Sequence, residues 1–317
     1  MSSSATGRRA ASGSPGFLKR SQPRYGEKAI KVLLVAASLV SVLTTIGIVI
    51  ALIPPAGEFF GKVNFGDFIT GTNWAPLFKP PHFGVLPLVT GTLMVTLVAL
   101  LVSVPLGLGA AVYLSEYAHP RVRTVFKPVL EVLAGIPTVV YGFFALKAIT
   151  PLLQDIFWPA GDGPQVFNAL AAGFVMGVMI IPTIASLAED SMNAVPRALR
   201  DGAFALGSSR MQVSTRVVFP AALSGIVAAV VLGISRALGE TMIVAIAAGG
   251  RPNLSFNPLE GMQTMTAFIA AAGIGDLPTG STGYQTIFAV GLLLFVMTLV
   301  MNLVSIRLVR KYREVYE

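Results

Sequence analysis

Two residues of opposite charge, Arg236 and Glu240, lie four positions apart in the stretch GISRALGETMIV (233–244). The run around them (217–249) is otherwise almost entirely apolar. On a continuous helix these two positions share a face, so the side chains could form an ion pair. One interpretation is a buried interhelical ion pair that also reaches Glu131 or a partner subunit. The other is a path for an anion, in which Arg236 attracts the anion while Glu240 positions the arginine and limits how tightly the anion is held.

The cost of these charges depends on whether the run lies in a membrane, where a lone charge at the centre costs at least about 2.5–3.5 kcal/mol. Hydrophobic residues make up 54% of the 317 residues and charged residues 12%, which is about half the charged share of a soluble domain. Too few charges remain to cover a water-exposed surface, whereas a lipid-facing surface needs none. The composition therefore predicts a membrane protein.

The remaining composition excludes several other classes of protein. The net charge of +8 does not indicate nucleic-acid binding, because the basic residues gather beside the ends of apolar runs. The chain has no cysteine, which excludes disulfides and thiolate metal sites. Its two histidines, His82 and His119, lie far apart and outside the apolar runs. We therefore expect no metal site.

Six apolar runs are long enough to cross a bilayer as helices, because about 20 helical residues span its hydrocarbon core. The expected fold is therefore all-α, with six transmembrane helices. The third run is unusual because it carries Glu131, Pro137 and Lys147. The predicted spans are 30–53, 87–115, 128–150, 166–188, 217–249 and 284–306.

Glycine and proline mark the places where these spans should bend. The fifth run is longer than a bilayer requires, so it should tilt or break near Gly233, Gly239 or Gly249. Pro137 and Pro182 interrupt two other runs, and the carbonyls that they free need partners in neighbouring helices or in water. These prolines are either packing kinks or hinges for alternating access.

Lysine and arginine are distributed unevenly between the two sides of the predicted spans. Eighteen lie in the N-terminal tail, in alternate loops and in the C-terminal tail, whereas three lie in the other loops. Cytoplasmic loops carry the excess of positive charge, so both termini are predicted to be cytoplasmic. Residues 1–29 are predicted to be a disordered basic tail, and residues 30–317 the transmembrane domain.

The predicted cytoplasmic loop between the fourth and fifth spans (189–216) has the pattern of two short helices around a turn. Pro196 is suited to a first helical position, and Gly207 can adopt the left-handed conformation that ends a helix. Ser209 and Gln212 then form a possible capping box for a second helix. The loop is either a basic connector that fixes topology or a rigid docking element for a cytoplasmic partner.

The stretch RDGAFALGSSRMQVSTRVVFPAAL (200–223) resembles the EAA loop of the permeases of ABC importers. Asp201, Gly202 and Ala203 stand at the Glu-Ala-Ala positions, Gly207 at the glycine and Pro220 at the proline. In that family the segment is a coupling helix that docks on the ATPase subunit, and the fold is that of a type I ABC importer permease. The resemblance therefore favours the docking interpretation.

Three further stretches resemble the PstC family of permeases from phosphate importers: GIPTVVYGFFAL (135–146), SRALGETMIVAIAAGG (235–250) and FNPLEGMQTMTAFIA (256–270). This resemblance implies a permease in the bacterial plasma (inner) membrane that forms a phosphate pathway with a PstA-like permease. It also implies two PstB-like ATPase subunits and a PstS-like extracytoplasmic phosphate-binding protein. The phosphate pathway would include Arg236 and Glu240.

The sequence contains no GxxxxGK[ST] phosphate-binding loop, so we expect that the partner ATPase uses ATP and that this chain binds no cofactor and is not an enzyme. Within the resemblance, the alternative is the paralogous PstA-type subunit. Outside it, the alternatives are an ATP-independent anion transporter or channel and a non-transporting scaffold. Secondary transporters usually contain two related halves, and we find no internal repeat in this sequence.

Overall fold

The computed structural model describes residues 25–157, 163–275 and 277–311, and most of the predicted N-terminal tail lies outside these ranges. The described residues contain five helices long and apolar enough to cross a membrane, or six when one bent pair counts as a single span. The structure divides into two compact units, residues 1–48 and 49–317. The prediction of an all-α membrane fold is confirmed.

Helix α1 (Tyr25–Lys62) begins in the first unit and ends in the second. In the first unit its apolar side chains are exposed all along the helix, which is typical of a helix that faces lipid or another chain. In the second unit its last turns bury Phe59 in an aromatic cluster with Phe68 of α2 (Phe65–Thr70).

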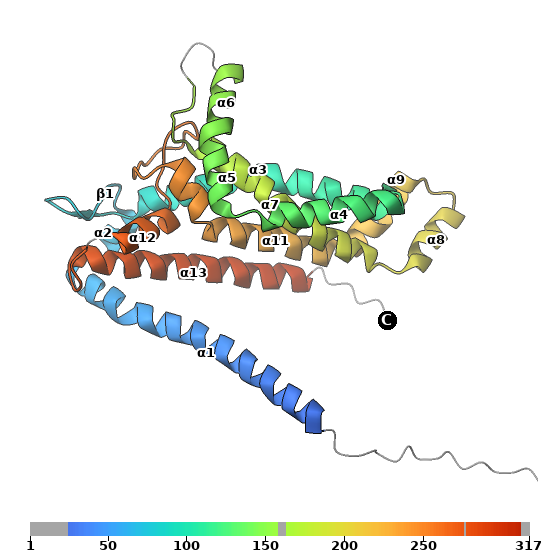
Figure 1. Cartoon of the computed structure of the whole chain (residues 1–317), viewed down its shortest axis with the longest axis horizontal. Coiled ribbons are helices and arrows are strands. Elements are labelled where there is room, and N and C mark those ends of the chain that lie inside the picture. Colours follow the sequence, from blue (N-terminus) through green and yellow to red (C-terminus); the bar gives the residue numbers. More distant parts are fainter. Residues whose placement is uncertain (1–24, 158–162, 276, 312–317) are drawn as a thin grey trace, which may run out of the picture. The chain divides into compact units, whose positions relative to one another are not determined.

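Four long helices run side by side in the second unit: α3 (Leu86–Val112), α7 (Ala169–Asn193), α11 (Leu223–Gly239) and α13 (Thr282–Lys311), as Figure 1 shows. We call these four helices the bundle. Helices α3 and α7 pack most closely, because Gly173 and Gly177 leave room for the α3 backbone. A Cβ atom on Gly177 would lie 2.7 Å from the Ala99 carbonyl oxygen. Small residues four apart allow such contact between membrane helices.

The two ends of the bundle carry different structures. At the hairpin end, α2 leads into an antiparallel hairpin of β1 (Trp74–Ala75) and β2 (His82–Phe83), and α12 (Met265–Ile274) packs beside them. At the opposite end, called here the α8 end, lie α8 (Arg197–Ala205) and α9 (Arg210–Val213) (Figure 1). The predicted loops therefore gather at opposite ends of the same helices.

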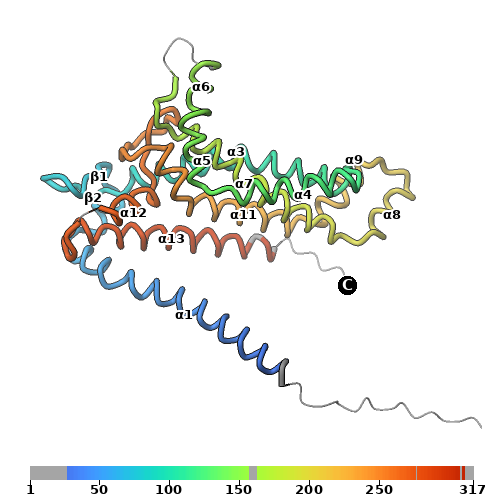
Figure 2. Tube along the Cα trace, in the orientation of Figure 1, coloured from blue at the N-terminus to red at the C-terminus, as the bar shows by residue number. Residues whose placement is uncertain are grey.

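The third predicted span is placed wrongly. The chain forms an amphipathic helix α4 (Pro120–Gly135), breaks at Ile136 and Pro137, and continues as α5, η2 and α6. The apolar segment is 138–156 rather than 128–150. Pro137 favours the break because it has no backbone N–H and disfavours a helical conformation at Ile136. Figure 2 shows that α5 and α6 point out of the bundle. The bounds are α5 (Thr138–Phe144), η2 (Ala145–Ile149) and α6 (Thr150–Phe157).

The fifth predicted span consists of several helices rather than one. The helical segment 210–221 is bent by 73° from α11, and α11 ends at Gly239. Gly249 has a φ of 102°, so it ends the next helical segment as expected. Gly233 does not break the helix; it lies inside α11 and packs against Ile184. The remaining short elements are η1 (Tyr113–Tyr117), η3 (Ser214–Val218), α10 (Phe219–Ala221) and η4 (Val244–Ala248).

Candidate functional site

The stretch that contains Arg236 and Glu240 is a broken helix, so the expected contact between these two residues is not formed. Arg236 lies in the last turn of α11, whereas Glu240 follows the helix end with extended backbone angles (φ −66°, ψ 132°). The i and i+4 rule applies only to a continuous helix. Among the residues that the structure describes, no ion pair joins Arg236 to Glu240 or to Glu131. The expectation of an ion pair on one helix face is wrong.

Glu240 instead holds the helix break in place. Its Oε1 accepts hydrogen bonds from the backbone N–H groups of Met242 (3.1 Å) and Ile243 (3.4 Å), at the start of the next helical segment. Its own carbonyl accepts a hydrogen bond from Thr266 Oγ1 of α12 at 2.7 Å. Free backbone groups inside a membrane protein must find such partners. Glu240 therefore stabilises a break in the middle of a predicted span.

Arg236 has a neutral partner. Its Nη1 donates to Thr183 Oγ1 of α7 at 3.2 Å. Thr183 follows Pro182, which is buried within α7 and does not interrupt that helix. Arg236 is partly exposed. Within the described part of the chain no carboxylate neutralises its guanidinium group, so the group keeps donors that can bind an anion.

A cavity of about 170 Å³ lies between α4 and α7. Thr183 lines this cavity, and its hydroxyl accepts the hydrogen bond from Arg236, which does not itself line the cavity. Other polar groups around the cavity are Ser186, Glu131 and Lys127. The complete set of lining residues is Lys127, Leu130, Glu131, Ala134, Pro182, Thr183, Ser186 and Glu189.

The second helix break, at Ile136 and Pro137, lies in a chain segment that packs against the first break. Gly142 of α5 approaches the segment after Glu240 so closely that an added Cβ would lie 3.1 Å from the Ile246 Cβ. The two broken helices are therefore in direct contact. Broken helices of this kind form the substrate sites of many transporters. Whether Pro137 or Pro182 acts as a hinge stays a prediction.

Sequence reasoning missed Thr183, Thr266 and Tyr141 as parts of this region. The Tyr141 hydroxyl donates to the Leu133 carbonyl at 2.8 Å and so bridges the break between α4 and α5. The signal in the sequence was a hydroxyl group inside an apolar run, since such groups can hydrogen-bond across membrane helices. The sequence alone does not show which hydroxyl contacts which helix.

The predicted docking loop has the expected local structure. Gly207 has a φ of 81°, the Ser208 N–H bonds to the Ala203 carbonyl, and the Gly207 N–H bonds to the Phe204 carbonyl. This is the Schellman pattern that ends a helix. Ser209 begins α9 with the predicted capping box. The helix start differs by one residue, because Pro196 is the N-cap of α8 rather than its first residue.

The surface of this loop is unusually apolar. The Leu206 side chain is 89% exposed, and Met211 and Phe204 are also exposed. Asp201 and Gly202 lie on the exposed part of α8, whereas Ala203 is partly buried against the bundle. Pro220 lies in α10, just before the 73° bend. An exposed apolar surface rimmed by polar residues marks a protein interaction site.

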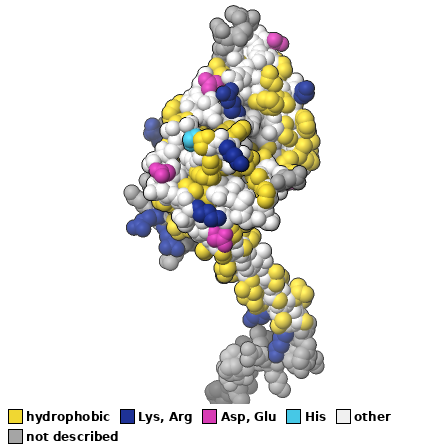
Figure 3. Space-filling model, turned by 90° about the vertical axis from the view of Figure 1, so that its left-hand side faces the viewer, with side chains coloured by type: hydrophobic (Ala, Val, Ile, Leu, Met, Phe, Trp, Pro, Cys, Tyr) yellow, Lys and Arg dark blue, Asp and Glu magenta, His cyan; other side chains and the backbone are white. Residues whose placement is uncertain are grey.

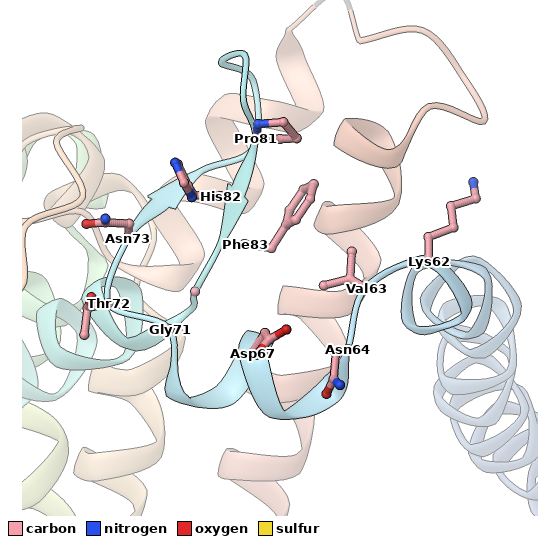
Figure 4. Close-up of a pocket in the computed structure, with 11 residues that line it drawn as sticks. Lys62, Val63, Asn64, Asp67, Gly71, Thr72, Asn73, Pro81, His82 and Phe83 are labelled. Carbon is pink, nitrogen blue, oxygen red and sulfur yellow. The ribbon is translucent and has the colours of Figure 1, made fainter.

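A larger cavity of about 500 Å³ lies at the hairpin end, between α2 and the hairpin (Figure 4). His82, Asn73 and Thr72 lie on the hairpin side, and Asp67 and Asn64 on the α2 side. Figure 3, which looks onto this end, shows basic and acidic side chains among apolar ones. None of the predicted site residues lines this cavity.

The chain matches the family described as "Binding-protein-dependent transport system inner membrane component" over residues 103–314. The chain belongs to this family. It is similar to the probable ABC transporter permease protein YqgH of Bacillus subtilis (35% identity, covering 84% of this chain and 86% of the relative). It is also similar to the phosphate transport system permease protein PstC of Mesorhizobium japonicum (34% identity, covering 83% of this chain and 83% of the relative). A third relative is the phosphate transport system permease protein PstC 1 of Mycobacterium tuberculosis (36% identity, covering 79% of this chain and 83% of the relative).

Solved structures share the fold at low sequence identity. An alginate ABC transporter chain matches with a TM-score of 0.62 at 15% identity, covering 92% of this chain and 100% of the other. A chain of the MetNI methionine ABC transporter matches with a TM-score of 0.52 at 19% identity, covering 73% of this chain and 95% of the other. The predicted type I importer permease fold is confirmed. The chain is a multi-pass inner-membrane permease subunit of an ABC importer.

Proposed function

We propose that this permease carries inorganic phosphate into the cell as one of two pore-forming subunits of an ATP-driven importer. The names of the PstC relatives, which cover about four fifths of the chain, support phosphate as the substrate. The second permease would be PstA-like, with two PstB-like ATPase subunits and a PstS-like binding protein. The PstA-type subunit remains the alternative within the family.

One observation carries the proposed role of Arg236 in the phosphate pathway: among the described residues, the Thr183 hydroxyl is the only hydrogen-bond partner of its guanidinium. A permanent charge without a carboxylate partner is costly in a membrane unless water or an anion meets it. Phosphate is an anion with several acceptor oxygens, which suit the fixed donors of arginine. The nearby helix break at Glu240 lets the pathway pass between helices.

Topology and energy source complete the proposal. The α8 end faces the cytoplasm, both termini are cytoplasmic, and the apolar loop surface around Leu206 docks on the ATPase. Moving one negative charge inward costs about 2.3 kcal/mol per 100 mV of inside-negative potential. Accumulation of phosphate therefore needs an energy source. The partner ATPase supplies it through ATP, and this chain binds no cofactor.

Uptake of labelled phosphate by vesicles that contain the reconstituted complex tests this function. We expect uptake that requires ATP and the binding protein, and that sulfate does not inhibit. Uptake without ATP would support an ATP-independent transporter, and a complex that hydrolyses ATP without moving phosphate would contradict the proposal.

Arg236→Gln tests the role of the arginine in the same vesicles. Because Gln keeps a polar amide but loses the charge, we expect uptake to fall at least about tenfold, as for a lost charge-assisted contact. Arg236→Lys should retain part of the activity, and Arg251→Gln, an exposed residue of a different loop, serves as the control. Normal uptake by Arg236→Gln in an assembled complex would remove Arg236 from the pathway.

A further inference from the structure

Arg200 connects the docking helix α8 to two helices of the bundle. Its Nη2 donates to Glu116 Oε1 at 3.0 Å and to the Met192 carbonyl at 2.8 Å, and its Nη1 donates to the Val195 carbonyl at 2.6 Å. The Arg200 and Glu116 side chains are only 16% and 10% exposed. The planar guanidinium group binds several acceptors at once. One side chain thus joins α8 to η1 at the end of α3 and to the end of α7.

The contacts continue from Glu116 across α7 to α4. Ser115 Oγ lies 3.0 Å from Glu116 Oε1 and 3.3 Å from Asn193 Oδ1. Asn193 Nδ2 donates to Glu189 Oε1 at 3.2 Å, and Glu189 pairs with Arg123 of α4 at 3.3 Å. Glu189 is 1% exposed, so its charge depends on these partners. The single Ser115 hydroxyl hydrogen can serve only one of its two acceptors, Glu116 Oε1 and Asn193 Oδ1. The connection therefore runs from Arg200 directly to the Met192 and Val195 carbonyls at the end of α7, and from Glu189 of α7 to Arg123 of α4.

A second basic residue of α4, Lys127, adds to the contact between α7 and α4. Lys127 Nζ donates to Asp190 Oδ1 at 3.1 Å and lies 3.7 Å from Glu189 Oε2. The hydrogen bond to Asp190 raises the pKa of Lys127 against the opposing effect of desolvation, so Lys127 stays charged at neutral pH. Lys127 also lines the same cavity as Thr183, whose hydroxyl accepts the hydrogen bond from Arg236. The contacts therefore end beside the proposed pathway.

Apolar packing already holds the loop in place without Arg200. Val213 and Val218 of the loop are fully buried against Ala111 of α3 and Ala188 of α7. Arg200 faces the bundle, whereas Leu206 and Met211 are exposed for a partner. The polar contacts of Arg200 are thus additional to the packing that places the loop.

We propose that Arg200 is a positioning residue that transmits movement of the docked ATPase from α8 to α3, α7 and α4. This inference rests on the proposed function. When the ATPase displaces α8, the hydrogen bonds of Arg200 pull Glu116 and the C-terminal end of α7 along with it. Glu189 passes the movement to Arg123 and Lys127, which carry α4 and the helix break that follows it.

The test compares Arg200→Met, Glu116→Gln and the double variant in the reconstituted complex. We measure phosphate transported per ATP hydrolysed, because a residue that only stabilises the fold lowers both rates together. We expect the ratio to fall about tenfold in Arg200→Met, which is within the usual range of coupling between sites. The double variant should lose no more than Arg200→Met alone, because both changes remove the same contact.

Arg121→Met is the matched control, since Arg121 is an exposed arginine at the same end of the bundle. Its ratio should equal that of the wild type. If Arg200→Met does not assemble, Arg200→Lys replaces it. Lysine keeps the charge, but its single nitrogen cannot take the place of the two separate nitrogens, Nη1 and Nη2, that Arg200 uses, so its ratio should still fall. An unchanged ratio in an assembled Arg200 variant would overturn the inference. Failure of the wild-type complex to move phosphate would instead overturn the proposed function.

Discussion

At the scale of single residues, Arg236 and Glu240 have different structural roles although they lie only four positions apart in the sequence. Arg236 reaches across to α7, whereas Glu240 stabilises the start of the next helical segment through two backbone N–H groups. An exchange of the two charges would therefore destroy the cap as well as move the arginine. Single substitutions of Glu240 that remove either its charge or its capping oxygen therefore test its role more sharply than an exchange of Arg236 with Glu240.

Glu240→Gln keeps an oxygen that accepts the two N–H bonds but removes the charge. We expect this variant to retain most phosphate uptake. Glu240→Ala loses the cap, which destabilises the start of the next helical segment by about 1 kcal/mol, and should lower uptake more than Glu240→Gln does. Uptake and complex assembly are measured together in vesicles. Equal and severe losses in both variants would show that the carboxylate charge, rather than the cap, is what the transporter needs.

At the scale of elements, the turn after α8 depends on one backbone conformation. Gly207 has a φ of 81°, and no atom would contact an added Cβ. A side chain at this position therefore costs energy through the backbone, by roughly 1–2 kcal/mol. We expect Gly207→Val to insert normally but to uncouple ATP hydrolysis from phosphate uptake.

Gly207→Asn is the matched control, because asparagine adopts the left-handed conformation more easily than valine. It should keep most of the coupling. Phosphate-stimulated ATP hydrolysis and uptake are measured in both variants. A Gly207→Val complex with normal values of both would contradict the docking role of this turn.

A substitution at Gly202 should stabilise α8, whereas Gly207→Val destabilises the turn that follows this helix. Gly202 lies in the middle of α8, and an added Cβ would meet no atom within 4 Å. Gly202→Ala should stabilise α8 by about 1 kcal/mol and leave transport intact. Hydrogen exchange of the α8 amides measures the stabilisation. Faster exchange in the alanine variant would show that a partner or neighbour occupies this space.

At the scale of the whole molecule, the proposed topology rests on the uneven distribution of basic residues. Ser208 lies at the α8 end and Asn73 at the hairpin end. Because the chain has no cysteine, a single cysteine at either position is the only thiol. We expect an impermeant thiol reagent to label position 73, and not 208, on intact cells. The reverse pattern would invert the proposed orientation.

Helix number, loop ends and the α8 turn were predictable, because hydropathy and capping are local signals. The positions of the helix breaks were predictable only in part: Gly239, Gly249 and Pro137 mark breaks as expected, whereas Gly233 and Pro182 do not. Gly233 was expected to weaken α11, but it packs against Ile184 inside an unbroken helix, so close packing rather than flexibility explains it. The break at Glu240 depends on Thr266, which is 26 positions away and provides the hydrogen bond to the free carbonyl. Tertiary partners of this kind leave no local pattern.

The contact of Gly142 with Ile246 limits the number of independent movements that this permease has. A Cβ on Gly142 would lie 3.1 Å from the Ile246 Cβ, so the two broken helices have no space to slide past each other freely. A bend at Pro137 must then be accompanied by a bend at Glu240. We therefore expect one opening transition rather than two, in which the breaks at Pro137 and Glu240 bend together.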